Sequence, residues 1–217
     1  MKFGDQGPTR VIVFGGTGRT GRLIVDEAVR DGHVVTVAAR RPETSADTFS
    51  ASVRVVRADV QDPASVASAL KDQDALVLAV SSSARRPGTL YSDAARNITA
   101  AADRTPVSRA IVVSSGGVRP DDSGLPLWYR RILIPLFMKD LYDDMRAMES
   151  AVTESTLDWT LVRAAYLQDT PAAGHFRVSD GTNPAGGWKL SRGDLARFTV
   201  DQLASDRWLR KAPTLAA

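Results

Sequence analysis

Short apolar runs alternate with helical patterns along most of the chain. The runs have the length of strands, are rich in Val and Ile, and are apolar at nearly every position, as strands covered on both faces of a sheet should be. They cover residues 10–14, 34–38, 53–57, 75–80, 109–114 and 159–163. The patterns between them predict helices near residues 21–31, 64–70, 92–104 and 139–155.

This alternation predicts an α/β fold. Consecutive strands that are joined through helices form a parallel sheet with right-handed crossovers. The 217 residues are enough for one sizeable core, and the chain contains no internal repeat and no linker that would divide it. We therefore expect a single doubly wound domain over residues 10–217, preceded by a flexible N-terminus at residues 1–9.

Composition argues against several classes of function. The chain has no cysteine and two histidines, so we predict no disulfide and no metal site. The formal charge of +3 is spread among acidic residues, which argues against a nucleic-acid partner despite a pI near 9.4. The polar N-terminus lacks the apolar core of a signal peptide, and no apolar run has the length of a membrane span. We therefore expect a cytoplasmic protein without a membrane partner.

The first strand pattern runs directly into a glycine-rich loop, "GGTGRTG", at residues 15–21. The pattern G-x-G-x-x-G between a buried strand and an amphipathic helix is typical of a dinucleotide-binding turn. Glycines let the backbone turn tightly and let a pyrophosphate approach, while the amide groups at the helix N-terminus bind the anion. Thr17 and Thr20 can add hydroxyl donors. The alternative is a tight turn that binds no ligand.

Two arginines, Arg40 and Arg41, follow the second strand pattern. An NAD-preferring site usually has Asp or Glu there, about twenty residues past the glycines, to hold the ribose hydroxyls. A guanidinium instead grips a 2′-phosphate through charge-assisted hydrogen bonds. The pattern therefore favours NADP(H) over NAD(H), with Arg19 of the glycine loop as an assisting cation. A solvated strand end is the alternative interpretation of both arginines.

Small and polar residues follow the next three strand patterns. Asp59 can accept a hydrogen bond from the adenine amino group, or it can be an N-cap or turn residue before Pro63. "LVLAVSSS" and "IVVSSGG" end the fourth and fifth strands, where a doubly wound fold has its cofactor crevice. We expect Ser114 and Ser115 to face the nicotinamide, where they would orient a carbonyl or the carboxamide, or else only to form a turn before Gly116.

These motifs resemble the atypical short-chain dehydrogenase/reductases, and more narrowly the NAD(P)H-binding proteins similar to biliverdin-IXβ reductase (flavin reductase) and the NmrA-like proteins. The resemblance extends from about residue 10 to residue 207. It is carried by "VFGGTGRTG", "GHVVTVAARRP", "RADVQDP", "DALVLAV", "AARNITAA", "IVVSSGG", "DDMRAMESAVTESTLDWTLVR" and "LSRGDLARFTVDQL". It implies a Rossmann-type parallel sheet, here of six to seven strands, with bound NADP(H) and a small-molecule substrate in the C-terminal part. It also implies a monomer or a homodimer.

The resemblance further implies which residues contact the cofactor. The glycine loop would hold the pyrophosphate, and the ends of successive strands would hold the 2′-phosphate, the adenine and the ribose. In that order the residues are Gly15, Thr17, Gly18, Arg19 and Thr20; Arg40, with Arg41 beside it; Asp59 and Val60; and Ala79, Val80 and Ser81. The sequence does not rank Arg40 against Arg41.

Two residues are candidates for the reaction itself. Ser115 would face the nicotinamide or the substrate, and Tyr166 stands where the biliverdin-IXβ reductases have a histidine. The Tyr-x-x-x-Lys pair of ordinary short-chain dehydrogenases, in which lysine lowers the tyrosine pKa, is replaced by Tyr142 and Arg146. Aligned with the family, the lysine position falls on Met145, one residue from Arg146. This disfavours alcohol oxidation by the usual proton relay, but not hydride transfer to an acceptor that takes its proton from water.

The segment over residues 120–145 is more apolar than a connector needs to be. Its apolar side chains are Trp128, Tyr129, Leu133, Ile134, Leu136 and Phe137. We interpret it as a lid over the substrate pocket, with a helix packed on the sheet or a dimer surface as the alternatives. An aromatic lid suits a flat conjugated acceptor, such as a flavin or quinone, better than a sugar.

The leading hypothesis is an NADP(H)-dependent oxidoreductase that transfers a hydride to an apolar conjugated or carbonyl acceptor of flavin, quinone or tetrapyrrole type. The missing Tyr–Lys pair favours a rival, a non-catalytic NADP-binding redox sensor that acts through a protein partner, as NmrA-like proteins can. An epimerase or dehydratase of a nucleotide sugar is a weaker third hypothesis, because the chain is short for the substrate lobe that those enzymes add.

Overall fold

The computed structural model describes residues 8–82 and 88–217. Of the N-terminus that we expect to be flexible, residues 1–7 therefore lie outside the described residues. Thr9 lies at the start of the fold, because its carbonyl accepts a hydrogen bond of 3.0 Å from the amide of Val34.

All six strands expected from the apolar runs are present. They are β1 (Arg10–Phe14), β2 (Val34–Ala39), β3 (Arg54–Arg57), β4 (Ala75–Leu78), β5 (Arg109–Ser115) and β6 (Asp158–Ala164). Each is parallel to its neighbours among these six. The side chains of β4 are all buried, which explains why its sequence is apolar at every position. The predicted Rossmann-type α/β fold is confirmed.

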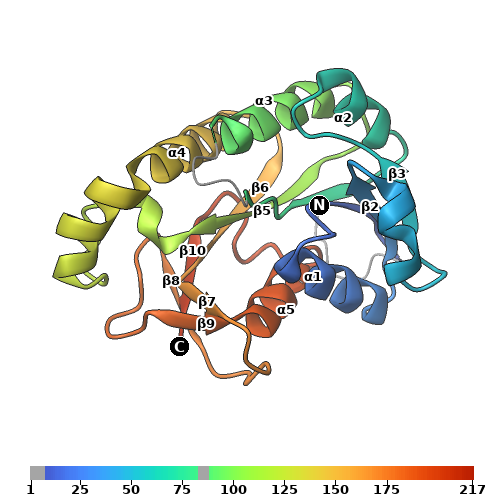
Figure 1. Cartoon of the computed structure of the whole chain (residues 1–217). Coiled ribbons are helices and arrows are strands. Elements are labelled where there is room, and N and C mark those ends of the chain that lie inside the picture. Colours follow the sequence, from blue (N-terminus) through green and yellow to red (C-terminus); the bar gives the residue numbers. More distant parts are fainter. Residues whose placement is uncertain (1–7, 83–87) are drawn as a thin grey trace.

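The strand order is β3-β2-β1-β4-β5-β6-β10-β8 (Figure 1). The last two, β10 (Pro213–Ala216) and β8 (Arg177–Asp180), bring the sheet to eight strands, more than the six to seven expected, and β8 is antiparallel to β10. The chain moves from β1 outward to β3, then returns to β4 on the other side of β1. This reversal leaves a crevice at the carboxyl ends of β1 and β4, where doubly wound folds bind ligands.

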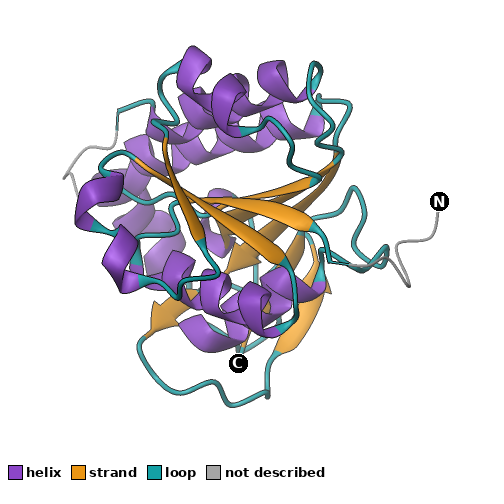
Figure 2. Cartoon of the chain, turned by 90° about the vertical axis from the view of Figure 1, so that its right-hand side faces the viewer, coloured by secondary structure: helices purple, strands orange, loops and turns teal. Residues whose placement is uncertain are grey.

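Helices cover both faces of the sheet, which forms the central layer in Figure 2. On one face lie α1 (Arg19–Arg30) and α5 (Arg192–Asp201); on the other lie α2 (Pro63–Ala69), α3 (Leu90–Ala102) and α4 (Lys139–Thr153) (Figure 1). Alternate residues of a strand point to opposite faces. Accordingly, Val11 and Val13 belong to the core under α1 and α5, whereas Ile12 and Phe14 belong to the core under α2, α3 and α4. Both cores hold β1 in place beneath the crevice.

Several shorter elements surround the carboxyl ends of the strands. They are single 3₁₀ turns at Pro42–Thr44, Ala46–Thr48 and Gly116–Val118, a wide π-type helix at Tyr129–Met138, and a parallel pair of strands, β7 (Tyr166–Gln168) and β9 (Lys189–Ser191). The wide helix is part of the apolar segment and extends outward from α4, at the left of Figure 1. Leu136 and Phe137 on it are 70% and 76% exposed. Between residues 8–82 and 88–217, no helix combines the length and the hydropathy that a bilayer crossing requires.

Candidate functional site

The glycine loop follows β1 and is built from close backbone contacts. Gly15 has a φ of 84°, in the left-handed region that glycine adopts without strain. A Cβ on Gly15 would collide with the carbonyl of Ala79 after β4, and a Cβ on Gly21 would collide with the carbonyl of Gly15. The amide of Gly18 donates to the same carbonyl at 3.0 Å and closes the turn. Glycine is therefore required wherever the loop meets β4 and α1.

Helix α1 starts at this loop with its backbone amides uncovered. Gly18 is the N-cap in an extended conformation, and no side chain among the described residues caps the first turn. The amide groups of a helix N-terminus and the positive end of the helix dipole together favour an anion. The first turn also carries no acidic residue that would repel a phosphate. The geometry matches the pyrophosphate site that the sequence predicts.

A cavity of about 380 Å³ extends from the glycine loop across the ends of β1, β2, β3 and β4. Its volume is within the range of small-molecule sites. The predicted cofactor residues that line it are Gly15, Thr17, Gly18, Arg40, Asp59, Val60, Val80 and Ser81. Apolar side chains, including Phe14, Ala38 and Leu90, form part of the remaining wall. The structure thus brings together residues from four separate strand ends around one space.

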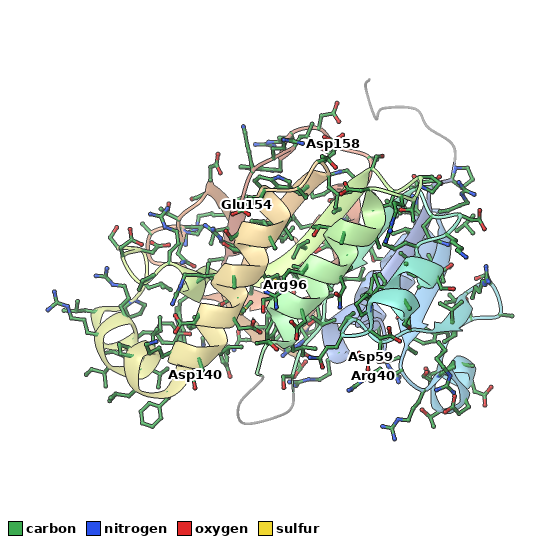
Figure 3. The ribbon with its side chains drawn as sticks, turned by 90° about the horizontal axis from the view of Figure 1, so that it is seen from above. Arg40, Asp59, Arg96, Asp140, Glu154 and Asp158 are labelled. Atoms are coloured by element: carbon green, nitrogen blue, oxygen red, sulfur yellow. The ribbon has the colours of Figure 1, made fainter. Side chains whose placement is uncertain are left out.

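The two arginines after β2 differ in position. Arg40 is exposed and lines the cavity, next to Asp59 in Figure 3. Its carbonyl accepts a hydrogen bond of 3.0 Å from Nη1 of Arg57, which fixes the backbone. Within the described ranges, the Arg40 guanidinium itself pairs with no other side chain. Arg41 lies outside the cavity lining, and its carbonyl accepts a hydrogen bond from Oγ1 of Thr44. Of the two, the structure favours Arg40 as the cation of the cavity.

Asp59 is both a turn residue and part of the cavity wall. Its Oδ1 accepts a hydrogen bond of 3.0 Å from the amide of Gln61, whereas the N-cap of α2 is Asp62. Val60 is buried, and its carbonyl accepts a hydrogen bond of 2.8 Å from Nδ2 of Asn97 on α3. The turn interpretation and the ligand-facing interpretation of Asp59 are therefore compatible.

The other predicted cofactor residues lie around the cavity rather than in its lining. Arg19 forms an ion pair of 2.8 Å with Asp169, just after β7, and Arg192 holds the other oxygen of that carboxylate at 3.0 Å. Thr20 is in the first turn of α1, and Ala79 is buried behind the glycine loop. The Arg19 pair links the glycine loop to the C-terminal part of the chain.

The two serines at the end of β5 have different surroundings. Ser114 is buried, and its hydroxyl donates a hydrogen bond of 2.6 Å to the carboxylate of Glu149 on α4. The same carboxylate forms an almost buried ion pair of 2.6 Å with Arg163 of β6. Ser114 is thus committed to the packing of α4 on the sheet, and we find no support for it facing a nicotinamide. Ser115 is half-buried, and its Oγ accepts a hydrogen bond of 3.2 Å from the amide of Gly117.

Ser115 is the first of three hydroxyl groups in a row. Its Oγ is 3.4 Å from Oη of Tyr142 on α4, which is in turn 2.7 Å from Oη of Tyr129. Tyr142 is buried, and a Cβ on Gly117 would collide with its hydroxyl. Burial, and secondly the neighbouring Tyr142, raise the pKa of Tyr129, so this phenol remains protonated.

This hydroxyl row was not evident from the sequence. The sequence gives little reason to select Tyr142, because the lysine of the Tyr-x-x-x-Lys pattern is missing. No motif or residue spacing in the sequence indicates Tyr129. Arg146, at the lysine spacing, donates 2.9 Å to the carbonyl of Val118 and pairs with Asp143, so it points away from Tyr142. Only the folded α4, packed against the end of β5, brings the hydroxyls together.

Tyr166 lies at the surface. It is 65% exposed, is outside the cavity lining, and stacks on Trp188 with ring centroids 6.0 Å apart. It follows Ala164 by two residues, and Ala164 pairs in register with Ser115. Strand spacing and chain length therefore keep its Cα within about 12 Å of that of Ser115. Tyr166 thus lies beyond the end of β5 and outside the lining of the cavity.

Similarity to known proteins agrees with this arrangement. A family model described as NAD(P)H-binding matches residues 15–206, from the glycine loop to beyond α5. The chain belongs to the NAD(P)H-binding family. The glycine loop, the uncapped start of α1 and the lined cavity are what a member needs to hold the pyrophosphate and the adenosine half of its cofactor. In the ranges that the structure covers, no group of three or more acidic or histidine side chains could hold a metal ion.

Known proteins resemble this NAD(P)H-binding protein along nearly its whole length. An uncharacterized chloroplastic protein of Arabidopsis thaliana is 26% identical over 212 residues, which are 93% of this chain and 72% of that protein. A short-chain dehydrogenase/reductase of Veillonella parvula, solved in complex with NADP, superimposes with a TM-score of 0.81 at 15% identity over 96% of this chain and 94% of that one. A proposed NADH-flavin reductase of Streptococcus pneumoniae has a TM-score of 0.76 at 19% identity, over 96% and 99%. At these identities the two structures show that the fold is shared.

Proposed function

We propose that this protein is an NADP(H)-dependent oxidoreductase of the atypical short-chain type, which reduces an apolar conjugated or carbonyl acceptor. The observation that carries the proposal is the cavity, whose lining includes both the glycine loop and Arg40, a residue whose guanidinium pairs with no other described side chain. When bound, the nicotinamide supplies the hydride, and the protein supplies binding and orientation.

In this proposal, the cofactor lies along the strand ends. Gly15, Gly18 and the start of α1 bind the pyrophosphate, with hydroxyls from Thr17 and Thr20 beside them. Asp59 and Val60 face the adenine, and Ala79, Val80 and Ser81 border the ribose. Arg40 binds the 2′-phosphate and gives the preference for NADP(H). A guanidinium forms charge-assisted hydrogen bonds with the negatively charged phosphate, whereas an acidic residue would repel it. The NADP bound to the Veillonella parvula protein supports this choice of cofactor.

The acceptor binds in the C-terminal part of the domain, beyond the end of β5. Ser115 is half-buried there and can donate a hydrogen bond to an acceptor oxygen, and Tyr166 offers an exposed aromatic face nearby. The apolar segment adds Trp128, Leu136 and Phe137, all more than half exposed. Such surroundings suit a flat conjugated molecule. The flavin reductase assignment of the Streptococcus pneumoniae protein supports the same acceptor class.

A second candidate function is a redox sensor that binds NADP(H) without turnover. One observation favours it: Arg146 replaces the expected lysine and is engaged by Asp143 and the Val118 carbonyl. Such a sensor would act through a protein partner, with the exposed apolar segment as the contact.

Steady-state oxidation of NADPH, with NADH in parallel, separates the two functions. The acceptors are FMN, riboflavin, two quinones and biliverdin, and the control is the Gly15→Ala protein at equal concentration. An oxidoreductase gives saturable turnover with at least one acceptor and prefers NADPH. A sensor binds NADPH but consumes it with none of them.

A further inference from the structure

We propose that Tyr129 supplies the proton of the reaction, through Tyr142 and Ser115. The proposal rests on the proposed function, and it assigns to Tyr129 a role that replaces the missing lysine. It also narrows the acceptor to one whose oxygen takes up a proton as it is reduced, such as an aldehyde, a ketone or a quinone.

The three hydroxyl groups form a continuous path. Tyr129 and Tyr142 are 2.7 Å apart, the normal length of an O–H···O hydrogen bond. The hydrogen bond between Ser115 and Tyr142 is longer, at 3.4 Å, and Ser115 Oγ is its donor in the resting structure, so both hydroxyls must rotate before Tyr142 can pass a proton to Ser115. Catalytic hydrogen bonds are often long before the substrate binds and shorten in the complex. The path therefore leads from Tyr129 on the wide helix to the half-buried Oγ of Ser115 at the end of β5.

Tyr142 needs such a partner because it has little direct access to water. Its side chain is 3% exposed, and its hydroxyl is covered by the backbone of Gly117. Two cations lie within four residues of Tyr142 on its own helix, and both are engaged elsewhere: Lys139 and Arg146 pair with Asp143, and Arg146 also donates to the carbonyl of Val118. Tyr129 is less buried than Tyr142 and stands at the base of the exposed segment, beside Trp128, which is 55% exposed. Tyr142 thus has two hydroxyl partners among the described residues, Ser115 and Tyr129, and both are half-buried.

The proton balance of the step closes. As the acceptor takes the hydride, the oxygen on which negative charge develops takes the proton of Ser115 and becomes a hydroxyl group. Ser115 regains a proton from Tyr142, Tyr142 regains one from Tyr129, and Tyr129 regains one from water. The acceptor has gained a hydride and one proton, and the three side chains are unchanged. The raised pKa of Tyr129 keeps it in the protonated form that this transfer needs.

Single and double Tyr→Phe variants test this path. Tyr129→Phe and Tyr142→Phe each remove one hydroxyl and keep the ring, and Ser150→Ala is the matched control, because it removes an exposed hydroxyl from α4 away from the path. We expect each Phe variant to lower kcat by about 100-fold, the usual size of a general-acid contribution. KM for the acceptor and the NADPH affinity should stay unchanged, and Ser150→Ala should behave as wild type.

The double variant separates proton transfer from a merely structural role. Because one break is enough to interrupt a path, Tyr129→Phe/Tyr142→Phe should be no slower than Tyr142→Phe alone. If the two substitutions instead caused independent packing defects, their fold-losses in kcat would multiply.

Wild-type kcat in Tyr129→Phe would overturn the proposal, as would multiplying losses of kcat in the double variant. Tyr129→Phe alone is decisive if Tyr142→Phe does not fold. Failure of the proton path can be told apart from failure of the proposed function. If the proposed function is wrong, the wild-type protein itself oxidises NADPH with none of the acceptors.

Discussion

Replacing Arg40 by glutamine tests the cofactor preference most sharply. In the structure Arg40 lines the cavity with a guanidinium that pairs with no other described side chain, so Arg40→Gln breaks no ion pair within the described residues and removes only the positive charge. A hydrogen bond to a charged group contributes about 1.5–3 kcal/mol. Because Arg40 is exposed, we expect the lower end of that range, which corresponds to about tenfold weaker NADPH binding. NADH lacks the 2′-phosphate, and its affinity should not change.

The assay is a fluorescence titration of each variant with NADPH and with NADH. Arg41→Gln is the matched control, because it removes the same charge one residue further along, outside the cavity lining. We expect Arg41→Gln to retain wild-type selectivity. Equal losses for NADPH and NADH in Arg40→Gln, or a larger effect in Arg41→Gln, would refute the assignment of the 2′-phosphate to Arg40.

Three other substitutions test the scaffold of the site. Gly15→Ala should abolish NADPH binding and lower Tm more than Gly32→Ala, because both glycines have positive φ but only the Cβ on Gly15 meets another backbone; equal Tm losses would contradict this. Glu149→Gln should cost about 3 kcal/mol in urea unfolding, because it leaves the almost buried guanidinium of Arg163 without its carboxylate partner, and a loss well below that would mean that the pair is hydrated. Although burial raises the pKa of Asp194, hydrogen bonds from Ser191 and from two backbone amides outweigh it and lower that pKa. The stability from this carboxylate is complete above its ordinary pKa and is lost as pH falls through the lowered one. Asp194→Asn should therefore be less stable than wild type at about pH 7, with a smaller difference at about pH 3; urea midpoints that differ equally at both pH values would exclude this cause.

The central part of the fold was predictable because its signals are local. Strands buried on both faces are apolar throughout, and the glycine loop has to be glycine wherever a Cβ would meet backbone, as at Gly15 and Gly21. The outer strands gave no such signal. β8 has the sequence RVSD, with every position partly or fully exposed, and β10 has four residues beginning with proline. β10 pairs with β6, and β8 pairs with β10, through long-range contacts that no local pattern encodes.

The candidate site divides in the same way. The cavity residues follow strand ends, so position along the chain was enough to find Arg40 and Asp59. Ranking Arg40 above Arg41 required the path of the backbone after β2. The hydroxyls of Ser115, Tyr142 and Tyr129 come from a strand, a helix and a connecting segment, and their contact depends on how α4 packs on the sheet. Sequence spacing could not show this, because the expected lysine was the only local marker of Tyr142.

The central claim is that the crevice binds NADPH and delivers its hydride to an acceptor. One stopped-flow sample tests both parts: the protein is mixed with equimolar NADPH, nicotinamide fluorescence is recorded, and a quinone is then added. The account predicts a change of fluorescence on binding, followed by its loss as NADPH is oxidised faster than in protein-free buffer. If the fluorescence changes on binding but is not lost after the quinone is added, nor in repeats with the other acceptors, the enzymatic claim is contradicted. No change on mixing would contradict the assignment of the glycine loop itself.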